Sequence, residues 1–368
     1  MKMTTGKRKA AIFHGAGKPF KVKSYPVSAP AAGMVGLSLT ASGICGTDVH
    51  IHDGRLGMPD FPLIIGHEFL GKVDAIGADV TQDGLGRVLA KGDQTVACVA
   101  IPCGVCFNCR RGETASCMAF GVTYAQNAEE APHFFGGLAE YLYSPAQNLV
   151  RLPDGVDALA AAAVPCGGPT VIRSCAYGGG LKAGELVVVQ GNGPLGLFAL
   201  AWAKAHDCRV VVIGSATNPL RLELMQAWKP ELFLDYRKAD AEAIKRELSR
   251  MTDADGADVV IETSGARDAF PLGLQLLRKR GRYFVPGQYS NSGAVTIEPQ
   301  LITFQALQII GSGQYTMADI LTYLEFLARH PEWQPLFAKM VSKYRVDDVN
   351  QAMADAKAGK VIKAVVTA

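Results

Sequence analysis

The sequence predicts an α/β protein with two domains, a β-rich domain followed by a doubly wound parallel sheet. Strand-like runs broken by Gly and Pro fill residues 10–98, where long helical periodicity is missing. Residues 186–213 instead contain two continuous apolar runs joined by a glycine-rich turn and an Ala/Leu-rich helix, the pattern of a parallel sheet. A length of 368 residues also exceeds what one ordinary core accommodates.

The composition indicates a globular protein without a nucleic-acid or membrane partner. Hydrophobic residues make up 49% of the chain and charged residues 19%, which supplies ample core material. A net charge of +3 gives no reason to expect nucleic acid or an anionic membrane as a partner. The basic N-terminus lacks the apolar segment of a secretory signal, and no apolar run approaches the roughly 20 residues that span a bilayer. We therefore expect a cytoplasmic location, where cysteines serve metal binding or catalysis rather than disulfides.

The first domain is predicted from short strands. Strand-like runs occur at 11–13, 35–39 and 70–76, separated by turn residues. The same texture returns between 136 and 155, and an Ala-rich helix is expected at 159–164.

A cysteine, a histidine and carboxylates stand at the ends of these runs. Catalytic zinc is typically held by three N and S ligands, with one position left open. Cys45 and His67 supply two such ligands, and Cys166 is the best candidate for the third. Asp48 is spaced to orient a ligand histidine through its other ring nitrogen. Cys45 or His67 alone would more often be an ordinary core residue, so the prediction depends on their combination.

Four further cysteines follow the pattern C-x2-C-x2-C-x7-C. They are Cys103, Cys106, Cys109 and Cys117. Such a segment can wrap one tetrahedral ion, and because a closed all-thiolate shell leaves no place for a substrate, a zinc ion here would be structural. An iron–sulfur cluster also uses four thiolates and is the main alternative.

A dinucleotide-binding turn connects the two apolar runs of the second domain. A strand at 186–190 is followed at once by G-x-G-x-x-G, then by a helix at 197–205 and a strand at 209–213. The residues expected to hold the pyrophosphate are Gly191, Gly193, Pro194, Leu195 and Gly196. In this context the glycines allow the tight turn and the close approach of phosphate, and the helix N-terminus supplies free N–H groups. The motif predicts a Rossmann-type domain.

Further βα units complete the second domain. The expected elements are strands at 257–263, 281–287 and 308–312, helices at 270–280, 317–329 and 346–358, and a last strand at 361–366. We expect the last strand to return to the first domain. The predicted domains are residues 1–168, completed by 308–368, and residues 169–307.

The order of these motifs resembles the zinc-dependent medium-chain alcohol dehydrogenase family over nearly the full length. A cysteine followed by Gly-Thr-Asp-x-His precedes Gly-His-Glu, the four-cysteine segment, Cys166 and the dinucleotide motif. The resemblance implies a GroES-like catalytic domain beside the Rossmann domain, with two zinc ions per chain and a nicotinamide cofactor.

The resemblance also assigns roles to single residues. Cys45, His67 and Cys166 look like the ligands of the catalytic zinc, and the four-cysteine segment looks like the structural zinc lobe. Glu68 looks like the adjacent carboxylate that approaches the metal during ligand exchange. Thr47 occupies the position of the proton-relay hydroxyl and His50 that of the histidine on its solvent side. The implied reaction gives a ketone or aldehyde, since zinc lowers the pKa of a bound alcohol and nicotinamide accepts hydride.

The end of the second apolar strand departs from the usual NAD pattern. It reads Ile213-Gly214-Ser215, without the acidic residue that binds the adenosine ribose in NAD enzymes. Gly214 and Ser215 are similar to NADP-using relatives, yet no Arg follows directly, and Arg221 comes only later. Because a 2′-phosphate without an adjacent cation is poorly held, the sequence favours NAD, with NADP as the alternative.

Two features bear on the substrate. Val99 stands where many family members have a bulky aromatic, which favours a branched or cyclic secondary alcohol, although it is equally well explained as strand core. Residues 124–135 are either a lid or an ordinary surface insertion. Polyol or amino-alcohol oxidation is the second candidate, and a non-catalytic redox sensor is the alternative of another class. The resemblance further implies a homodimer or homotetramer that pairs through the edge strand near 308–313.

Overall fold

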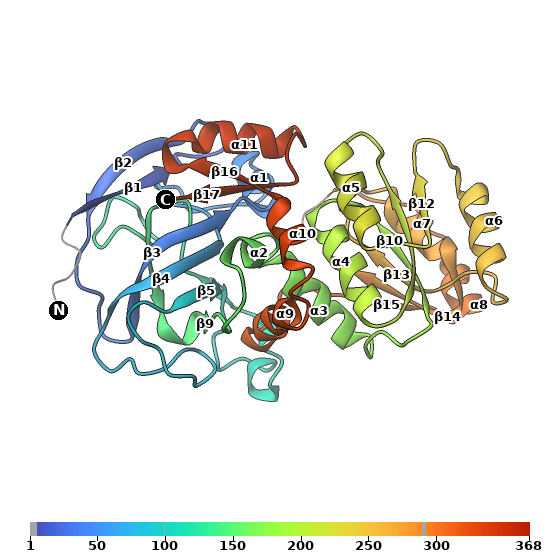
Figure 1. Ribbon diagram of the computed structural model, residues 1–368, viewed down its shortest axis with the longest axis horizontal. Helices are drawn as coiled ribbons and strands as arrows, with labels where there is room; N and C mark the ends of the chain where they lie inside the picture. The colour runs from blue at the N-terminus through green and yellow to red at the C-terminus, as the bar shows by residue number, and fades with distance from the viewer. Residues whose placement is uncertain (1–5, 99, 289–291) are drawn as a thin grey trace. The chain divides into compact units, whose positions relative to one another are not determined.

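The chain folds into two compact units. The computed structural model describes residues 6–98, 100–288 and 292–368 (Figure 1). The first unit comprises Met1–Cys166 and Tyr315–Ala368, and the second comprises Gly167–Gln314. The second unit extends beyond the predicted end at 307, because residues 308–311 form the last strand of its sheet.

A seven-stranded sheet forms the framework of the first unit. Six strands lie in the order β16-β17-β3-β4-β5-β9, and β8 also pairs with β3. Their bounds are β3 Met34–Gly43, β4 Glu68–Ile76, β5 Gln94–Cys98, β8 Tyr141–Pro145, β9 Leu149–Arg151, β16 Val341–Arg345 and β17 Lys363–Thr367. β17 pairs antiparallel with β3, so the C-terminal strand returns to the first unit as predicted. The side chains of Leu37, Phe69 and Leu142 are buried in the core beside this sheet.

Among its described residues, the first unit also contains two two-stranded antiparallel pairs, five α-helices and four short 3-10 helices. β1 (Lys7–Ile12) pairs with β2 (Lys21–Pro26), and β6 (Ala100–Ile101) pairs with β7 (Gly121–Val122). The helices are α1 Gly46–His52, α2 Ala158–Ala162, α9 Met317–Arg329, α10 Gln334–Lys339 and α11 Val349–Lys357. Helix α9 has the predicted bounds. Its start is fixed because Thr316 and Asp319 cap each other's backbone N–H groups.

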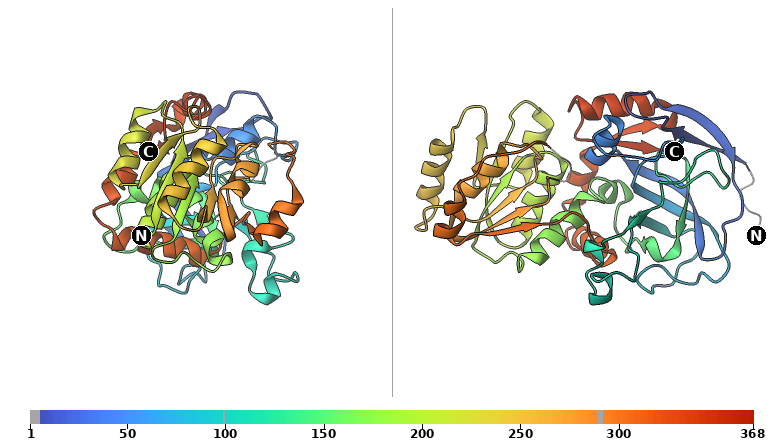
Figure 2. Two further views of the ribbon diagram at one scale, coloured as in Figure 1. Left: turned by 90° about the vertical axis from the view of Figure 1, so that its right-hand side faces the viewer. Right: turned by 180° about the vertical axis from the view of Figure 1, so that it is seen from behind.

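The second unit is a parallel six-stranded sheet in the order β12-β11-β10-β13-β14-β15. The strands are β10 Leu186–Gln190, β11 Arg209–Gly214, β12 Leu232–Asp235, β13 Ala257–Glu262, β14 Leu277–Val285 and β15 Gln308–Gly311. Its helices are α3 Gly167–Tyr177, α4 Pro194–Ala205, α5 Pro219–Ala227, α6 Ala241–Met251, α7 Ala269–Leu276 and α8 Pro299–Gln305. The strand order runs outward in both directions from β10, so the crossover helices cover both faces (Figure 2).

Two predicted helices are too long. The helix expected at 346–358 is a 3-10 helix at Val346–Asp348 followed by α11. The helix expected at 270–280 ends at Leu276, because Leu277 pairs with Ala257 and begins β14. β14 pairs with strands on both sides, and this pairing outweighs the helical pattern of the sequence at 277–280. In the described part of the chain, no helix is long and apolar enough to cross a membrane.

Candidate active site and metal centres

Four side chains with metal-binding atoms meet in the first unit. Ligand atoms of Cys45, His67, Glu68 and Cys166 all lie within 4.8 Å of one another. Cys45 follows the end of β3, whereas Glu68 begins β4, and the antiparallel register pairs Gly43 with Glu68. This pairing brings Cys45 beside His67 and Glu68.

Asp48 fixes the geometry of this cluster. Its side chain is fully buried, and one carboxylate oxygen accepts the backbone N–H of Cys45 at 2.8 Å. The other oxygen lies 3.3 Å from Nδ1 of His67. With Nδ1 turned toward a carboxylate, Nε2 of His67 remains available for a metal.

The donor set fits zinc. Two thiols and one imidazole are the N and S ligands that a catalytic zinc site uses. A hydrogen bond with Cys166, together with the charge of His67, holds the pKa of the Cys45 thiol well below its ordinary value despite burial. Cys45 therefore favours the thiolate form, which is the form that binds metal.

Two residues that the sequence analysis did not single out also belong to this cluster. The ammonium group of Lys363, on β17, contacts the carboxylate of Glu68. The hydroxyl of Tyr315 makes a hydrogen bond with Cys166, and burial raises the pKa of Tyr315, so this phenol stays protonated. One signal in the sequence could have revealed Lys363, because a lysine inside the apolar run 361–366 is almost never buried without a partner.

The predicted relay residues both lie on α1. Oγ1 of Thr47 is 4.0 Å from Sγ of Cys45. His50 follows one helical turn later, so the two side chains share one side of the helix. Burial and the nearby charge of Arg55 lower the pKa of His50, which keeps its imidazole neutral at pH 7.

The four cysteines of the predicted structural site also converge. Ligand atoms of Cys103, Cys106, Cys109 and Cys117 lie within 4.8 Å of one another. Backbone N–H groups donate to three of these sulfur atoms, at 3.3 to 3.4 Å. Such donors stabilise thiolates, and the β6–β7 pair closes the base of the lobe. The arrangement fits a closed four-thiolate zinc site.

Each glycine of the dinucleotide turn meets a different structural requirement. Gly191 has a φ of +111°, which favours glycine. A Cβ on Gly196 would collide with the carbonyl oxygen of Gly191, so only glycine allows this close packing. Gly193, which precedes α4, has open space around its α-carbon. This free space beside a helix N-terminus fits the pyrophosphate of a dinucleotide.

The end of β11 reveals a cation that the sequence analysis missed. The side chain of Asn192 bonds both the carbonyl and the N–H of Ser215, which fixes the chain just after Gly214. The backbone N–H of Tyr236 donates to the carbonyl of Gly214, and the guanidinium of Arg237 lies 5.6 Å from the Tyr236 ring centroid. The parallel pairing of β11 with β12 thus brings an exposed arginine to the strand end where adenosine ribose is bound in this fold.

Residues 124–135 are anchored in the first unit. The N–H of Ala128 donates to the carbonyl of Pro62, and Phe134 is completely buried against Tyr141. The ring of Tyr124, at the start of the segment, lies 6.4 Å from the ring of His67. The segment therefore contributes to the surroundings of the metal cluster. Val99 lies outside the described residues.

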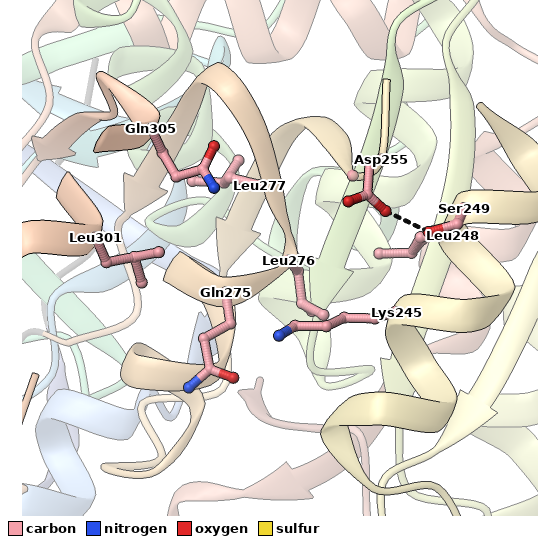
Figure 3. Close-up of a pocket in the computed structure, with 10 residues that line it drawn as sticks. Lys245, Leu248, Ser249, Asp255, Gln275, Leu276, Leu277, Leu301 and Gln305 are labelled. Atoms are coloured by element: carbon pink, nitrogen blue, oxygen red, sulfur yellow. Dashed lines mark hydrogen bonds between the residues drawn. The ribbon is translucent and has the colours of Figure 1, made fainter. Parts of the chain in front are cut away.

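The second unit also contains a surface pocket (Figure 3). Its lining includes Lys245 and Leu248 from α6, Leu301 from α8, and the residues just before β13 and at the start of β14. Among the described residues that line it, none belongs to a predicted site. The pocket is near the amino ends of the strands, whereas dinucleotides bind outside the carboxyl ends.

The chain matches known proteins over both units. Residues 31–154 match the alcohol dehydrogenase GroES-like domain, and residues 194–329 match the zinc-binding dehydrogenase domain. The 5-exo-hydroxycamphor dehydrogenase of Pseudomonas putida is 30% identical over 93% of both chains. An L-threonine 3-dehydrogenase of Anaeromyxobacter is 31% identical over 92% of this chain and 93% of its own. An alcohol dehydrogenase structure from Thermotoga maritima, 25% identical, superposes with a TM-score of 0.89 over 98% of this chain and 99% of its own.

Fold and site together define a zinc-dependent oxidoreductase of the alcohol and polyol dehydrogenase type. The chain belongs to the zinc-dependent medium-chain alcohol dehydrogenase family. The predicted combination of a GroES-like domain with a Rossmann domain is confirmed.

Proposed function

We propose that this enzyme oxidises a secondary alcohol, bulky or cyclic, with NAD or NADP, or reduces the corresponding ketone. The observation that carries the proposal is the cluster of Cys45, His67 and Cys166, whose donor chemistry is that of a catalytic zinc site. The similarity to a hydroxycamphor dehydrogenase, whose name denotes a cyclic alcohol, supports the substrate class.

Each residue of the site has a proposed role. Cys45, His67 and Cys166 hold the zinc ion, which when bound supplies Lewis-acid polarisation of the substrate oxygen. Asp48 orients His67, while the hydroxyl of Thr47 receives the substrate proton and passes it toward His50. Cys103, Cys106, Cys109 and Cys117 hold the structural zinc.

The cofactor site is proposed in the second unit. Gly191, Gly193, Pro194, Leu195 and Gly196 form the pyrophosphate turn, and Gly214 and Ser215 contact the adenosine ribose. A bound nicotinamide supplies the hydride acceptor. The absence of an acidic residue after β11 and the presence of Arg237 make the site compatible with the 2′-phosphate of NADP as well as with NAD.

Polyol or amino-alcohol oxidation is the second candidate. It is supported by the similarity to a sorbitol dehydrogenase of Halalkalibacterium halodurans, 29% identical over 96% of this chain, and to the L-threonine 3-dehydrogenases. A small hydrophilic substrate would need polar partners beside the metal.

The test is nicotinamide absorbance with zinc-loaded enzyme, NAD or NADP, and a panel of alcohols. The panel includes linear primary alcohols, cyclic secondary alcohols, sorbitol and threonine. Reduction of cofactor with cyclic secondary alcohols is expected. Activity confined to sorbitol or threonine would transfer the assignment to the second candidate, and cofactor binding without any oxidation would indicate a non-catalytic redox sensor.

We also propose that the protein is a homodimer or homotetramer of cytoplasmic location. The edge strand β15 leaves Gln308 and Ile309 exposed, and an unpaired edge can pair with the same edge of a second copy. Light scattering after size-exclusion chromatography measures the assembly, and a monomer at micromolar concentration would contradict it.

A further inference from the structure

Lys363 and Glu68 form a buried ion pair beside the metal-binding cluster. Nζ of Lys363 contacts Oε2 of Glu68, and the two side chains are only 6% and 1% exposed. An isolated charge in such a position is strongly unfavourable, whereas two opposite charges compensate each other. Each side chain therefore depends on the other for its position.

The backbone fixes the side from which Lys363 approaches. Lys363 begins β17, pairs with Val341 of β16, and donates its N–H to the carbonyl of Met340 at 3.1 Å. β17 also pairs with β3, where Val365 lies opposite Gly43. A Cβ on Gly43 would collide with both the Glu68 carboxylate and the Lys363 side chain, so glycine leaves the space that the pair occupies.

Glu68 is close enough to compete for the metal. One of its carboxylate oxygens lies within 4.8 Å of the ligand atoms of Cys45, His67 and Cys166. If Glu68 also bound, the protein would supply four ligands, which is the closed set of a structural zinc site. A dehydrogenase needs the fourth position for the substrate oxygen. A carboxylate that is paired with an ammonium group must break that pair before it binds metal fully.

We propose that Lys363 is a positioning residue that holds the Glu68 carboxylate beside the catalytic metal position and keeps the fourth coordination position open. This inference rests on the proposed zinc site at Cys45, His67 and Cys166. It assigns to Lys363 a function in the reaction that acts through Glu68.

The experiment uses the full-length protein with cobalt in place of zinc, because the absorption of Co²⁺ reports its coordination geometry. The variants are Lys363→Met, Glu68→Gln and the double variant of both. Cobalt bound at the four-cysteine site contributes the same background absorption in every variant. Lys343→Met, on the exposed side of neighbouring β16, is the matched control.

Lys363→Met is expected to release Glu68 onto the metal. The visible absorption of cobalt should then change, because a carboxylate oxygen replaces water at the fourth position, and kcat should fall by about tenfold or more. The double variant should regain the spectrum of the unmodified protein, because glutamine is a poor metal ligand. Glu68→Gln alone should keep that spectrum, since the carboxylate is not a ligand in the native site. Lys343→Met should change neither property.

The outcomes separate this inference from the proposed function. If the unmodified protein binds no metal at this cluster, the proposed zinc site itself fails. If it binds metal and Lys363→Met leaves the cobalt spectrum unchanged, the role of Lys363 is refuted. If Lys363→Met does not fold, the cobalt spectrum of Glu68→Gln tests the proposal instead. An altered spectrum in Glu68→Gln would mean that Glu68 already binds the metal despite Lys363, which would refute the proposed role of Lys363.

Discussion

The carboxylate of Asp48 lies 3.3 Å from Nδ1 of His67 and thereby joins helix α1 to the start of strand β4. The same carboxylate accepts the backbone N–H of Cys45 at 2.8 Å. One buried side chain thus positions two of the proposed zinc ligands.

Replacing Asp48 with Asn should weaken the catalytic zinc site. We expect zinc affinity or turnover to fall by about 10–100-fold, the usual effect of removing a carboxylate that orients a ligand histidine. Metal analysis after dialysis against a chelator should show loss of one zinc ion while the structural zinc is retained. Asp60→Asn, at an exposed position, is the control. Full zinc retention and normal turnover in Asp48→Asn would exclude this role.

Replacing Thr47 with Val should remove the first proton acceptor while leaving the metal in place. Turnover is expected to fall by about 100-fold or more, the lower range for loss of a general acid–base group. Thr47→Ser keeps the hydroxyl and should retain most of the activity. Near-normal kcat in Thr47→Val, measured at saturating alcohol, would remove Thr47 from the mechanism.

His50 should control the acid side of the pH profile. Burial and Arg55 lower its pKa, so it is neutral at pH 7 and in the form that can accept a proton. The rate of oxidation is therefore expected to be level above this lowered pKa and to decline as the pH falls through it. In His50→Gln the rate should be lower and this decline should disappear, which kcat measured over about pH 5–9 will show. An unchanged acidic limb in that variant would assign the titration to another group.

Removing one thiol of the four-cysteine lobe should affect stability more than chemistry. Cys106→Ser is expected to lower the zinc content from two ions per chain to one. Because metal binding contributes directly to folding, Tm should fall by about 10 °C, which corresponds to about 4 kcal/mol for a domain of this size class. Metal analysis and thermal unfolding measure both effects. Retention of two zinc ions would show that this cysteine is not a ligand.

Arg237 should discriminate between the two nicotinamide cofactors. A guanidinium that contacts a 2′-phosphate makes a charge-assisted hydrogen bond worth about 1.5–3 kcal/mol. Arg237→Ala is therefore expected to raise the KM for NADP by about tenfold or more and to leave the KM for NAD nearly unchanged. Arg246→Ala, on the exposed side of α6, is the control. Equal effects on both cofactors would place Arg237 away from the 2′ position.

Most of the predictions made from the sequence depend on patterns of residues that are close together in the chain. Cys103, Cys106, Cys109 and Cys117 stand at a spacing that only a short closed loop explains, and the structure brings their sulfur atoms together. The G-x-G-x-x-G turn could be interpreted because its strand and helix are adjacent in the chain. Cys45, Asp48 and His67 lie in one short stretch, so their chemistry and spacing predicted a common site.

The remaining features depend on contacts between distant segments. Lys363 reaches Glu68 because β17 pairs with β3, although these strands come from opposite ends of the chain. Arg237 reaches the end of β11 only through the parallel pairing of β11 with β12.

The sequence by itself therefore determined the fold class and predicted the candidate metal ligands and the dinucleotide turn, because most of these features, Cys166 excepted, depend on residues close in the chain. Only the tertiary structure decided that Lys363 lies beside Glu68 and that Tyr315 lies beside Cys166. The physical reason is that side-chain periodicity identifies the buried face of each strand, whereas the choice of partner strand follows from the burial and hydrogen bonding of the whole sheet.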